Sequence, residues 1–409
     1  MTIADELGRR IAGMRYEALP PEAVDWAKIS FIDTIACALA AAPEAGPRIV
    51  EKVLTPGGKT GPSLIWGTDR RVSSLDAAAI NGTAAHALDY DDCNNSLAGH
   101  PSAAVLPAVL ALGELTPERT ATALAISVSL ASGVKANFGT MTKPLHAGQC
   151  TRNGLYAALL AREGFTASAE AFEHKHGFLN VFNGAGNFDA EKILAGWADP
   201  LDILAPGVGL KQYPCCGSTH SAIDATILLR ERHGLTPERV AGIESVTHDR
   251  ALAHTDRPLP ASALDAKFSV QYCVARALMH GDVTFEHFEG DAWRDPEVRK
   301  LLGRIRARPH AHQSDGMYEH FQGEVIVTTT EGVTYSARVD QPLRGPQNPA
   351  PPDRLEPKFR DCAARALRAD AVSRVLETLR NFESLDNVRE LTELMAASVK
   401  ARSDTRVAA

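Results

Sequence analysis

Three short segments of this sequence each place a basic side chain beside the predicted start of a helix. In residues 99–102 (GHPS), Pro101 suits the first helical position and His100 stands directly before it. The other two are residues 143–148 (KPLHAG) and 211–220 (KQYPCCGSTH). A helix N-terminus offers unpaired N–H groups and partial positive charge. Three such ends in one cleft would bind a small molecule with several carboxylates.

The same groups suit the removal of a proton next to a carboxylate. That step forms an enolate, whose charge is stabilised by cations and N–H donors held around it. We expect Asp89 or His100 to be the acid/base group, and Lys143 and Lys211 to hold carboxylates and stabilise the enolate. Each segment taken alone is more often structural than catalytic, so the prediction depends on their combination.

Two other kinds of site were weighed against this one. The pattern Asp91-Asp92-x-x-Asn95 is faintly similar to the magnesium motif of terpenoid enzymes, but we find no second acidic motif with suitable spacing. The adjacent Cys215 and Cys216 are poorly placed to pair, and no second Cys/His cluster has zinc-finger spacing. No nucleotide-binding glycine pattern occurs either. These signals are weak, so no metal site is part of the leading expectation.

The elements that must position these residues are helices in the first half of the chain. Apolar spacing and capping residues predict helices over residues 21–39, 77–88, 101–112, 121–131, 149–162 and 168–174. No convincing strand precedes Pro206. Alanine-rich helices with few aromatic residues pack closely, which favours an all-α domain.

The pattern changes after Pro206. Strands are predicted over 242–248, 324–330 and 333–339, the last two joined as a hairpin, and helices over 269–279 and 296–305. A proline-rich linker at 341–352 precedes a helical end at 355–400. The predicted fold is mainly α. A large all-α domain, residues 1–205 and 346–409, is interrupted by a smaller α+β lid domain, residues 206–345.

Composition excludes several classes of function. The 409 residues carry a net charge of −7, which disfavours nucleic-acid binding. No apolar run is long enough to cross a bilayer, and the N-terminus does not read as a signal peptide. Seven scattered cysteines fit reduced thiols in a cytoplasm. We expect a cytoplasmic protein with a small-molecule partner, and neither nucleic acid nor membrane.

Several strings in the right order resemble the MmgE/PrpD family, over about residues 26–367. They are AINGTAAHALDYDD, GHPSAAVLPAVLAL, TMTKPLHAG, KQYPCCGSTHSAIDA, AKFSVQYCVARAL, RGPQNP and EPKFRDCA. The resemblance implies an all-α domain built from both chain ends, an inserted α+β lid and a homodimer. It also implies dehydration, decarboxylation or epimerisation of small polycarboxylates such as 2-methylcitrate, cis-aconitate or iminodisuccinate, without a cofactor.

The resemblance also assigns residues. The catalytic set that it implies is Asp89, His100, Lys143 and Lys211. The substrate-binding set that it implies is Cys93, His146, Cys216, His220, Lys267 and Tyr272. The family often has threonine at the position of Cys93. Cis-aconitate decarboxylase has a histidine at the position of Cys216, which argues against that particular activity.

One segment of the family pattern is missing near Glu114. In relatives, a few dozen residues separate the pieces that meet here at residues 112–119, and they carry a G-x-H-x-T motif with another active-site histidine. No such string occurs in this chain. The leading expectation is a dehydratase-type lyase without a cofactor. The alternatives are an epimerase or decarboxylase on a similar acid, an inactive carboxylate-binding relative, and a magnesium-dependent all-α enzyme.

Overall fold

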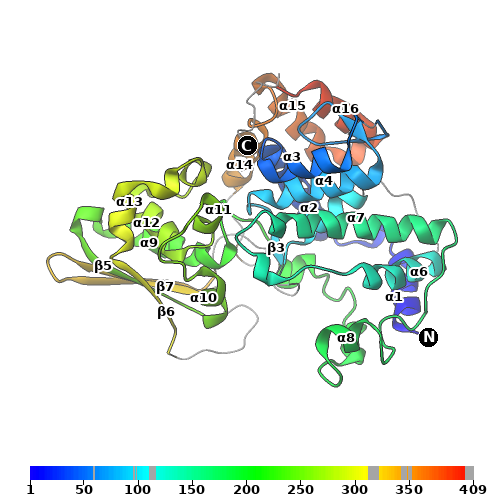
Figure 1. The fold of residues 1–409 in the computed structure, drawn as a ribbon, viewed down its shortest axis with the longest axis horizontal. Coiled ribbons are helices and arrows are strands. Elements are labelled where there is room, and N and C mark those ends of the chain that lie inside the picture. The colour runs from blue at the N-terminus through cyan, green and yellow to red at the C-terminus, as the bar shows by residue number, and fades with distance from the viewer. Residues whose placement is uncertain are drawn as a thin grey trace.

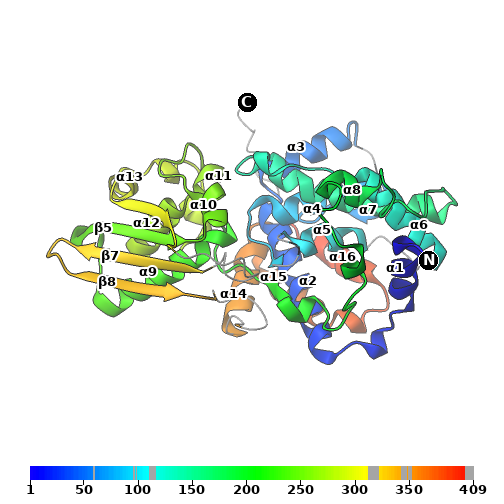
Figure 2. The same cartoon turned by 90° about the horizontal axis from the view of Figure 1, so that it is seen from below.

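The computed structural model describes residues 1–58, 60–94, 97, 99–109, 117–311, 322–341, 348 and 352–400. The chain is mainly helical, with a small mixed sheet in its C-terminal region (Figure 1). The mainly α class that the sequence predicts is therefore confirmed. The helices gather at one end of the molecule and the mixed sheet, with its own helices, lies at the other (Figures 1 and 2).

The helical part draws on both ends of the chain. Its N-terminal helices are α1 (Ile3–Gly13), α2 (Pro21–Ala41), α3 (Ala45–Leu54), α4 (Ser74–Ala87), α5 (Pro101–Val109), α6 (Pro117–Ser127), α7 (Thr142–Arg162) and α8 (Phe178–Asn183). Its C-terminal helices are α14 (Pro352–Ala363), α15 (Ala369–Arg380) and α16 (Val388–Ala397). One cluster of buried side chains joins residues of α2 and α4 to residues of α14, α15 and α16. Residues from both ends of the chain thus share one buried core.

Small residues let α4 and α7 approach closely. A Cβ on Gly148 would lie 2.1 Å from Thr83 Oγ1 and 2.2 Å from the backbone oxygen of Ala79, so only glycine fits there. α4 is capped at its start by Ser73, whose side chain accepts a hydrogen bond from the Asp76 N–H. The close crossing fixes the end of α4 relative to the start of α7, where two of the predicted site residues lie.

The mixed sheet has the strand order β6-β5-β7-β8. Its strands are β5 (Val240–Thr247), β6 (Ile305–Pro309), β7 (Gly323–Thr329) and β8 (Thr334–Val339). β5 runs parallel to β6 and antiparallel to β7, which forms the predicted hairpin with β8. The helices of this part are α9 (His220–His233), α10 (Asp249–Thr255), α11 (Ala263–Ala266), α12 (Val270–His280) and α13 (Pro296–Leu302). α9, α12 and α13 supply residues to a second buried cluster with the sheet.

Several elements differ from the expectation. α7 begins at Thr142, seven residues before the predicted start at residue 149. Short strands precede Pro206, namely β1 (Ser63–Leu64), β2 (Arg71–Val72) and β3 (Cys93–Asn94), and β3 pairs with β4 (Val208–Gly209). Residues 168–174, predicted as a helix, form turns. The helix predicted over 296–305 ends at Leu302, and β6 begins at Ile305. Runs of two residues carry too little periodicity to be recognised.

The domain boundaries at 205/206 and 345/346 stay a prediction, and most of the predicted linker, residues 341–352, lies outside the described residues. Within the described part, no single helix has the length and apolarity to cross a bilayer. The consecutive helices α2 and α3, bent by 85°, meet that test only as a pair.

Candidate active site

Three helix starts and one strand pair converge on a cavity of about 670 Å³. His100 precedes α5, Lys143 lies in the first turn of α7, and Cys216 precedes a short 3₁₀ helix (Gly217–Thr219) that leads into α9. All three line the cavity, together with Asp89, Cys93, Gly99, Lys135, Phe138, Lys211, Gly217, Ser218, Arg250, Ala251, Ala253, His254 and Phe268. The convergence that the sequence suggests is therefore present, and it includes the four residues expected to be catalytic.

Asp89 holds the two predicted lysines together. Lys143 Nζ lies 2.6 Å and Lys211 Nζ 2.8 Å from the same oxygen, Oδ1, and Lys211 also donates to the Asp89 backbone oxygen at 2.8 Å. The antiparallel pairing of β3 with β4 brings the two chain segments of Asp89 and Lys211 side by side. Burial alone would raise the pKa of Asp89, but the two lysines hold it well below its ordinary value. The site thus keeps one carboxylate between two ammonium groups.

Asp89 adopts an uncommon backbone conformation. It follows the last turn of α4 with a φ of 55°, in the left-handed region where a residue other than glycine is uncommon. Its second oxygen, Oδ2, is buried and finds no hydrogen-bond donor within the described parts of the chain. Strain and an unpartnered buried oxygen at one residue are typical of functional positions.

Aromatic rings enclose Lys143. Its Nζ lies 5.2 Å from the ring centres of both Phe138 and Phe268. Such rings attract an ammonium group through their faces and also keep water away from it. The charge of Lys143 therefore acts on the cavity with less screening than that of an exposed lysine.

His100 is held in one tautomer. Its Nδ1 lies 2.7 Å from the backbone oxygen of Asp92, and a carbonyl oxygen only accepts, so Nδ1 carries the proton. Nε2 therefore carries the lone pair, and it lies 3.8 Å from Asp89 Oδ1. Burial lowers the pKa of His100 below its ordinary value. The result is a neutral imidazole whose basic nitrogen faces the reactive end of the cavity.

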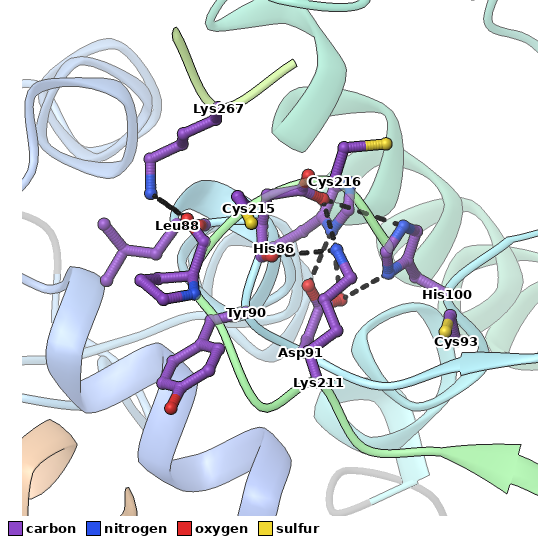
Figure 3. A network of polar contacts seen from close by, with 12 residues as sticks. His86, Leu88, Tyr90, Asp91, Cys93, His100, Lys211, Cys215, Cys216 and Lys267 are labelled. Atoms are coloured by element: carbon purple, nitrogen blue, oxygen red, sulfur yellow. Dashed lines mark hydrogen bonds and ion pairs between the residues drawn. The ribbon is translucent and has the colours of Figure 1, made fainter. Parts of the chain in front are cut away.

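A second layer supports His100, as Figure 3 shows. Asp91 accepts from His86 Nδ1 at 2.9 Å and approaches His100 Nδ1 at 3.3 Å, and the two imidazole rings lie 4.1 Å apart. Burial lowers the pKa of His86 to about 3, which keeps it neutral. Behind them Ser102 donates to Asp92, and burial raises the pKa of Asp92 to about 7. These residues do not line the cavity; they hold the imidazole ring of His100 in its orientation.

The four residues His86, Asp89, Asp91 and His100 lie close enough to share a metal ion, because one ligand atom of each falls within 4.8 Å of the others. The donor set does not fit a divalent cation well. Asp89 already carries two ammonium groups, and His100 Nδ1 is directed to a carbonyl oxygen. The magnesium alternative also needs Asp91 and Asp92, which are fully buried, and Asn95, which lies outside the described residues.

Two predicted cysteines line the same cavity. Cys93, on β3, points its thiol to the backbone oxygen of Gly209 at 3.6 Å. Cys216 stands at the start of the 3₁₀ helix, and burial raises the pKa of its thiol to about 11. Cys216 is therefore protonated near neutral pH, which makes it a proton donor rather than a nucleophile.

Four residues predicted to bind substrate lie outside the lining of this cavity. His146 lies in the second turn of α7, and its ring packs against Gly133. His220 is buried edge-on to Tyr213, with 5.2 Å between ring centres. Their predicted part in substrate binding stays a prediction.

Lys267 and Tyr272 are buried behind the site. Lys267 Nζ donates to the backbone oxygens of Leu88 and Pro214, both at 2.8 Å, and so joins the residue before Asp89 to the loop before Cys216 (Figure 3). Burial lowers the pKa of Lys267 to about 8. Tyr272 donates to the backbone oxygen of His287 at 2.5 Å. Neither residue lines the cavity, and their predicted part in substrate binding stays a prediction.

Several residues that line the cavity were not predicted from the sequence. Lys135, Phe138, Arg250, His254 and Phe268 line the cavity from loops and short helices whose sequences carry no recognisable signal.

A further missed residue is Lys358 of α14, within the quoted string EPKFRDCA. Its Nζ pairs with Asp33 of α2 at 2.6 Å and donates to the backbone oxygens of Tyr90 and Lys211 at 2.8 and 3.0 Å. The C-terminal part of the chain thus holds the backbone of the site in place.

Comparisons with known proteins identify the family of the chain. The model of the MmgE/PrpD N-terminal domain matches residues 5–116 and 112–191, and that of the MmgE/PrpD C-terminal domain matches residues 213–384. The N-terminal match is in two pieces that meet near Glu114, where the missing segment is predicted.

Among curated proteins, the chain is similar to three named cis-aconitate decarboxylases. It is 26% identical to that of Mus musculus over 400 residues, which cover 81% of each chain. It is 27% identical to that of Homo sapiens over 403 residues, covering 81% of this chain and 82% of the relative. For Aspergillus terreus the identity is 26% over 393 residues, covering 91% of this chain and 72% of the relative.

Proposed function

Because the chain belongs to the MmgE/PrpD family, we propose that it is a lyase that acts on a small polycarboxylate through a carbanion next to a carboxylate. Decarboxylation is the leading reaction in this proposal, since the relatives named above are cis-aconitate decarboxylases. The dehydration expected from the sequence becomes the second candidate. No cofactor is part of the proposed reaction.

One observation carries the proposal: Asp89 places two lysines on one oxygen, and the basic nitrogen of His100 lies 3.8 Å from that oxygen. Two cations against one carboxylate leave a net positive charge where a substrate carboxylate would bind. As charge moves from the reacting carbon into that carboxylate, Lys143 and Lys211 stabilise it without having to reorganise. Asp89 would hold both ammonium groups in place before the substrate arrives.

The decarboxylation step can be written for cis-aconitate. The bond between the CH₂ carbon and its carboxylate breaks, CO₂ leaves, and the electron pair remains on the carbon skeleton as an allylic carbanion. That charge spreads toward the remaining carboxylates, beside Lys143 and Lys211. A proton then adds to the far allylic carbon, and the double bond moves to the CH₂ carbon. Cys216 stands where cis-aconitate decarboxylase has a histidine, and we assign the proton transfer to its thiol, which is protonated and lines the cavity.

Dehydration is supported by a separate observation, the tautomer of His100. A dehydratase needs a base for the proton next to the carboxylate, and His100 offers a neutral imidazole with its lone pair toward the cavity. The electron pair of the C–H bond then forms the double bond as the hydroxyl leaves with a proton from an acid. Both reactions pass through the same stabilised charge, so they share Lys143 and Lys211.

Product analysis with two substrates separates the candidates. The purified protein is incubated with cis-aconitate and with 2-methylcitrate, and CO₂ release and new alkene signals are measured. The proposal expects CO₂ and an isomerised alkene from cis-aconitate. An alkene from 2-methylcitrate without CO₂ would favour the dehydratase. Binding of either acid without any turnover would contradict the lyase and support the inactive, carboxylate-binding relative.

A further inference from the structure

Three consecutive backbone oxygens at the end of α4 each accept a hydrogen bond from a different lysine. The oxygens of residues 88–90 accept from Lys267, Lys211 and Lys358, in chain order, each at 2.8 Å. We infer that Lys267 and Lys358 are positioning residues, which hold the backbone turn of Asp89 so that the ammonium groups of the site lie where charge develops on the substrate. This inference rests on the proposed function, because it concerns residues that act on the same reaction.

The two outer lysines also bond the chain segment that carries Lys211. Lys267 Nζ donates to the backbone oxygen of Pro214 at 2.8 Å, and Lys358 Nζ donates to that of Lys211 at 3.0 Å. Each outer lysine therefore bridges the turn of Asp89 and the segment of Lys211. We call Lys267 and Lys358 together the lysine clamp.

The clamp acts where the backbone needs support. Leu88 is the C-cap of α4, and carbonyl oxygens at a helix C-terminus lack helical partners and favour nearby cations. Asp89 follows with a φ of 55°, a strained conformation that persists only when surrounding contacts hold it. One oxygen of Asp89 orients both Lys143 and Lys211, so a loosened turn would move both ammonium groups.

Both clamp lysines place a positive charge in the interior. Lys267 is 4% exposed and Lys358 is 7% exposed. Lys358 pairs with the buried Asp33 at 2.6 Å, whereas no carboxylate forms an ion pair with Lys267 among the residues that the structure describes. A buried ammonium group is costly, and an apolar side chain would fill the same volume at lower cost. Burial of these charges therefore favours a role in the site over a role in stability.

The inference can be tested by binding, without turnover. The nitronate of 3-nitropropionate carries charge on two oxygens, as a carbanion next to a carboxylate does, and succinate is the matching dicarboxylate. Dissociation constants of both probes are measured by calorimetry on the full chain and on the Lys267→Met and Lys358→Ala variants. We expect the wild type to bind the nitronate at least about tenfold more tightly than succinate, because the site matches the charge of the carbanion.

Each variant should lose about tenfold in affinity for the nitronate and change less than about threefold for succinate, because displaced ammonium groups no longer match the two charged oxygens. On an acid that the wild type converts, kcat should fall about a hundredfold with little change in KM. Lys358→Ala leaves Asp33 without its partner, so Lys267→Met keeps the test open if Lys358→Ala does not fold.

An added amine distinguishes positioning from a general loss of structure. Lys358 lines a second cavity of about 530 Å³, together with Tyr90 and Gln212. Propylammonium can enter the space that Lys358→Ala leaves there and bond to Asp33 and the two backbone oxygens. It should restore most of the nitronate affinity and most of kcat.

Arg230→Met is the matched control. Arg230 of α9 also donates to a backbone oxygen, that of Leu278 at 3.0 Å, but it is outside the lining of both cavities. This variant should keep the nitronate preference and should not respond to the amine. Equal wild-type affinities for the two probes, clamp variants that behave like Arg230→Met, or an amine that restores the melting temperature without the nitronate affinity would overturn the inference.

The proposed function can fail separately. A clamp-dependent preference for the nitronate with no turnover of any acid would refute the lyase and leave the inference standing. Turnover of cis-aconitate with an unchanged kcat in both clamp variants would do the reverse.

Discussion

At the residue scale, the account depends on how Asp89 organises its neighbours. Two ammonium groups hold the pKa of the Asp89 carboxyl well below its ordinary value, so Asp89 is a weak base, and we propose that it fixes Lys143 and Lys211 rather than abstracts a proton. We therefore propose His100 as the base, since its Nε2 carries the lone pair in this tautomer. The sequence could not choose between Asp89 and His100, because the choice depends on which lone pair remains unoccupied.

Lys143→Met should abolish turnover while leaving the fold intact. We expect kcat to fall by about a hundredfold to a thousandfold, the usual effect of removing one group that stabilises a developing charge. The melting temperature should change little, because Lys211 still pairs with the buried Asp89. Lys175→Met, an exposed lysine outside the cavity lining, is the matched control. Full activity in Lys143→Met would remove this residue from the mechanism.

The pH dependence of kcat/KM tests the role of His100 as the base. Burial lowers its pKa below the ordinary 6.5, with Asp91 opposing the shift and Lys211 and Lys143 adding to it. The unprotonated base therefore persists to lower pH than for an exposed histidine. For a reaction that removes a proton, kcat/KM should stay level down to about pH 6.5 and fall below it. An acid limb centred well above pH 6.5 would be inconsistent with this assignment.

At the scale of elements, the site depends on the crossing of α4 and α7. Asp89 follows α4 and Lys143 opens α7, so the distance between the helices sets the ion pair between them. Gly148→Ala would place a methyl group 2.2 Å from the backbone oxygen of Ala79, which cannot yield as a flexible side chain would. We expect clear destabilisation in urea unfolding, by more than about 2 kcal/mol, together with loss of activity.

Gly154→Ala is the matched control on the same helix. A Cβ there meets nothing within 4 Å, and alanine is favoured over glycine in a helix interior by about 1 kcal/mol. This variant should therefore be as stable as the wild type or slightly more stable. If both variants unfold alike, the close crossing does not position the site in the way described.

The helices and strands differ in how well the sequence predicts them. Long helices such as α2, and the hairpin of β7 and β8, have clear periodicity and were predicted within a few residues. The pairing of β3 with β4 was missed, since two-residue strands depend on tertiary contacts. The start of α7 was placed too late because Pro144 lies in its first turn, where proline is tolerated.

The cavity-lining residues that the sequence indicated are those where a basic side chain stands beside a predicted helix start, namely His100, Lys143 and Lys211, whereas Cys216 was implied by the family resemblance. Residues that only the tertiary structure brings to the site have no signal in the sequence. Lys358 is an example, because it contacts the backbone of Tyr90 and Lys211 from more than a hundred residues away in the sequence. No local pattern could have indicated that contact.

At the scale of the whole molecule, the cavity receives residues from both the helical part and the sheet-bearing part. Asp89, His100 and Lys143 come from the former, while Arg250 and Phe268 come from the latter. A site assembled in this way can respond to substrate by a change in the relation of the two parts. The homodimer that the family resemblance implies stays a proposal, and sedimentation velocity of the purified chain would test it.

The central claim, a carbanion formed next to a carboxylate, is tested most directly by proton NMR in D₂O. The wild type and Lys143→Met are each incubated with 2-methylcitrate, citrate, cis-aconitate, malate and aspartate-derived acids. We predict that the wild type incorporates deuterium at the carbon beside a carboxylate of at least one of these acids or its product, and that Lys143→Met does not. Decarboxylation of cis-aconitate without deuterium in the product, or no exchange and no conversion with any of the acids, would contradict the account.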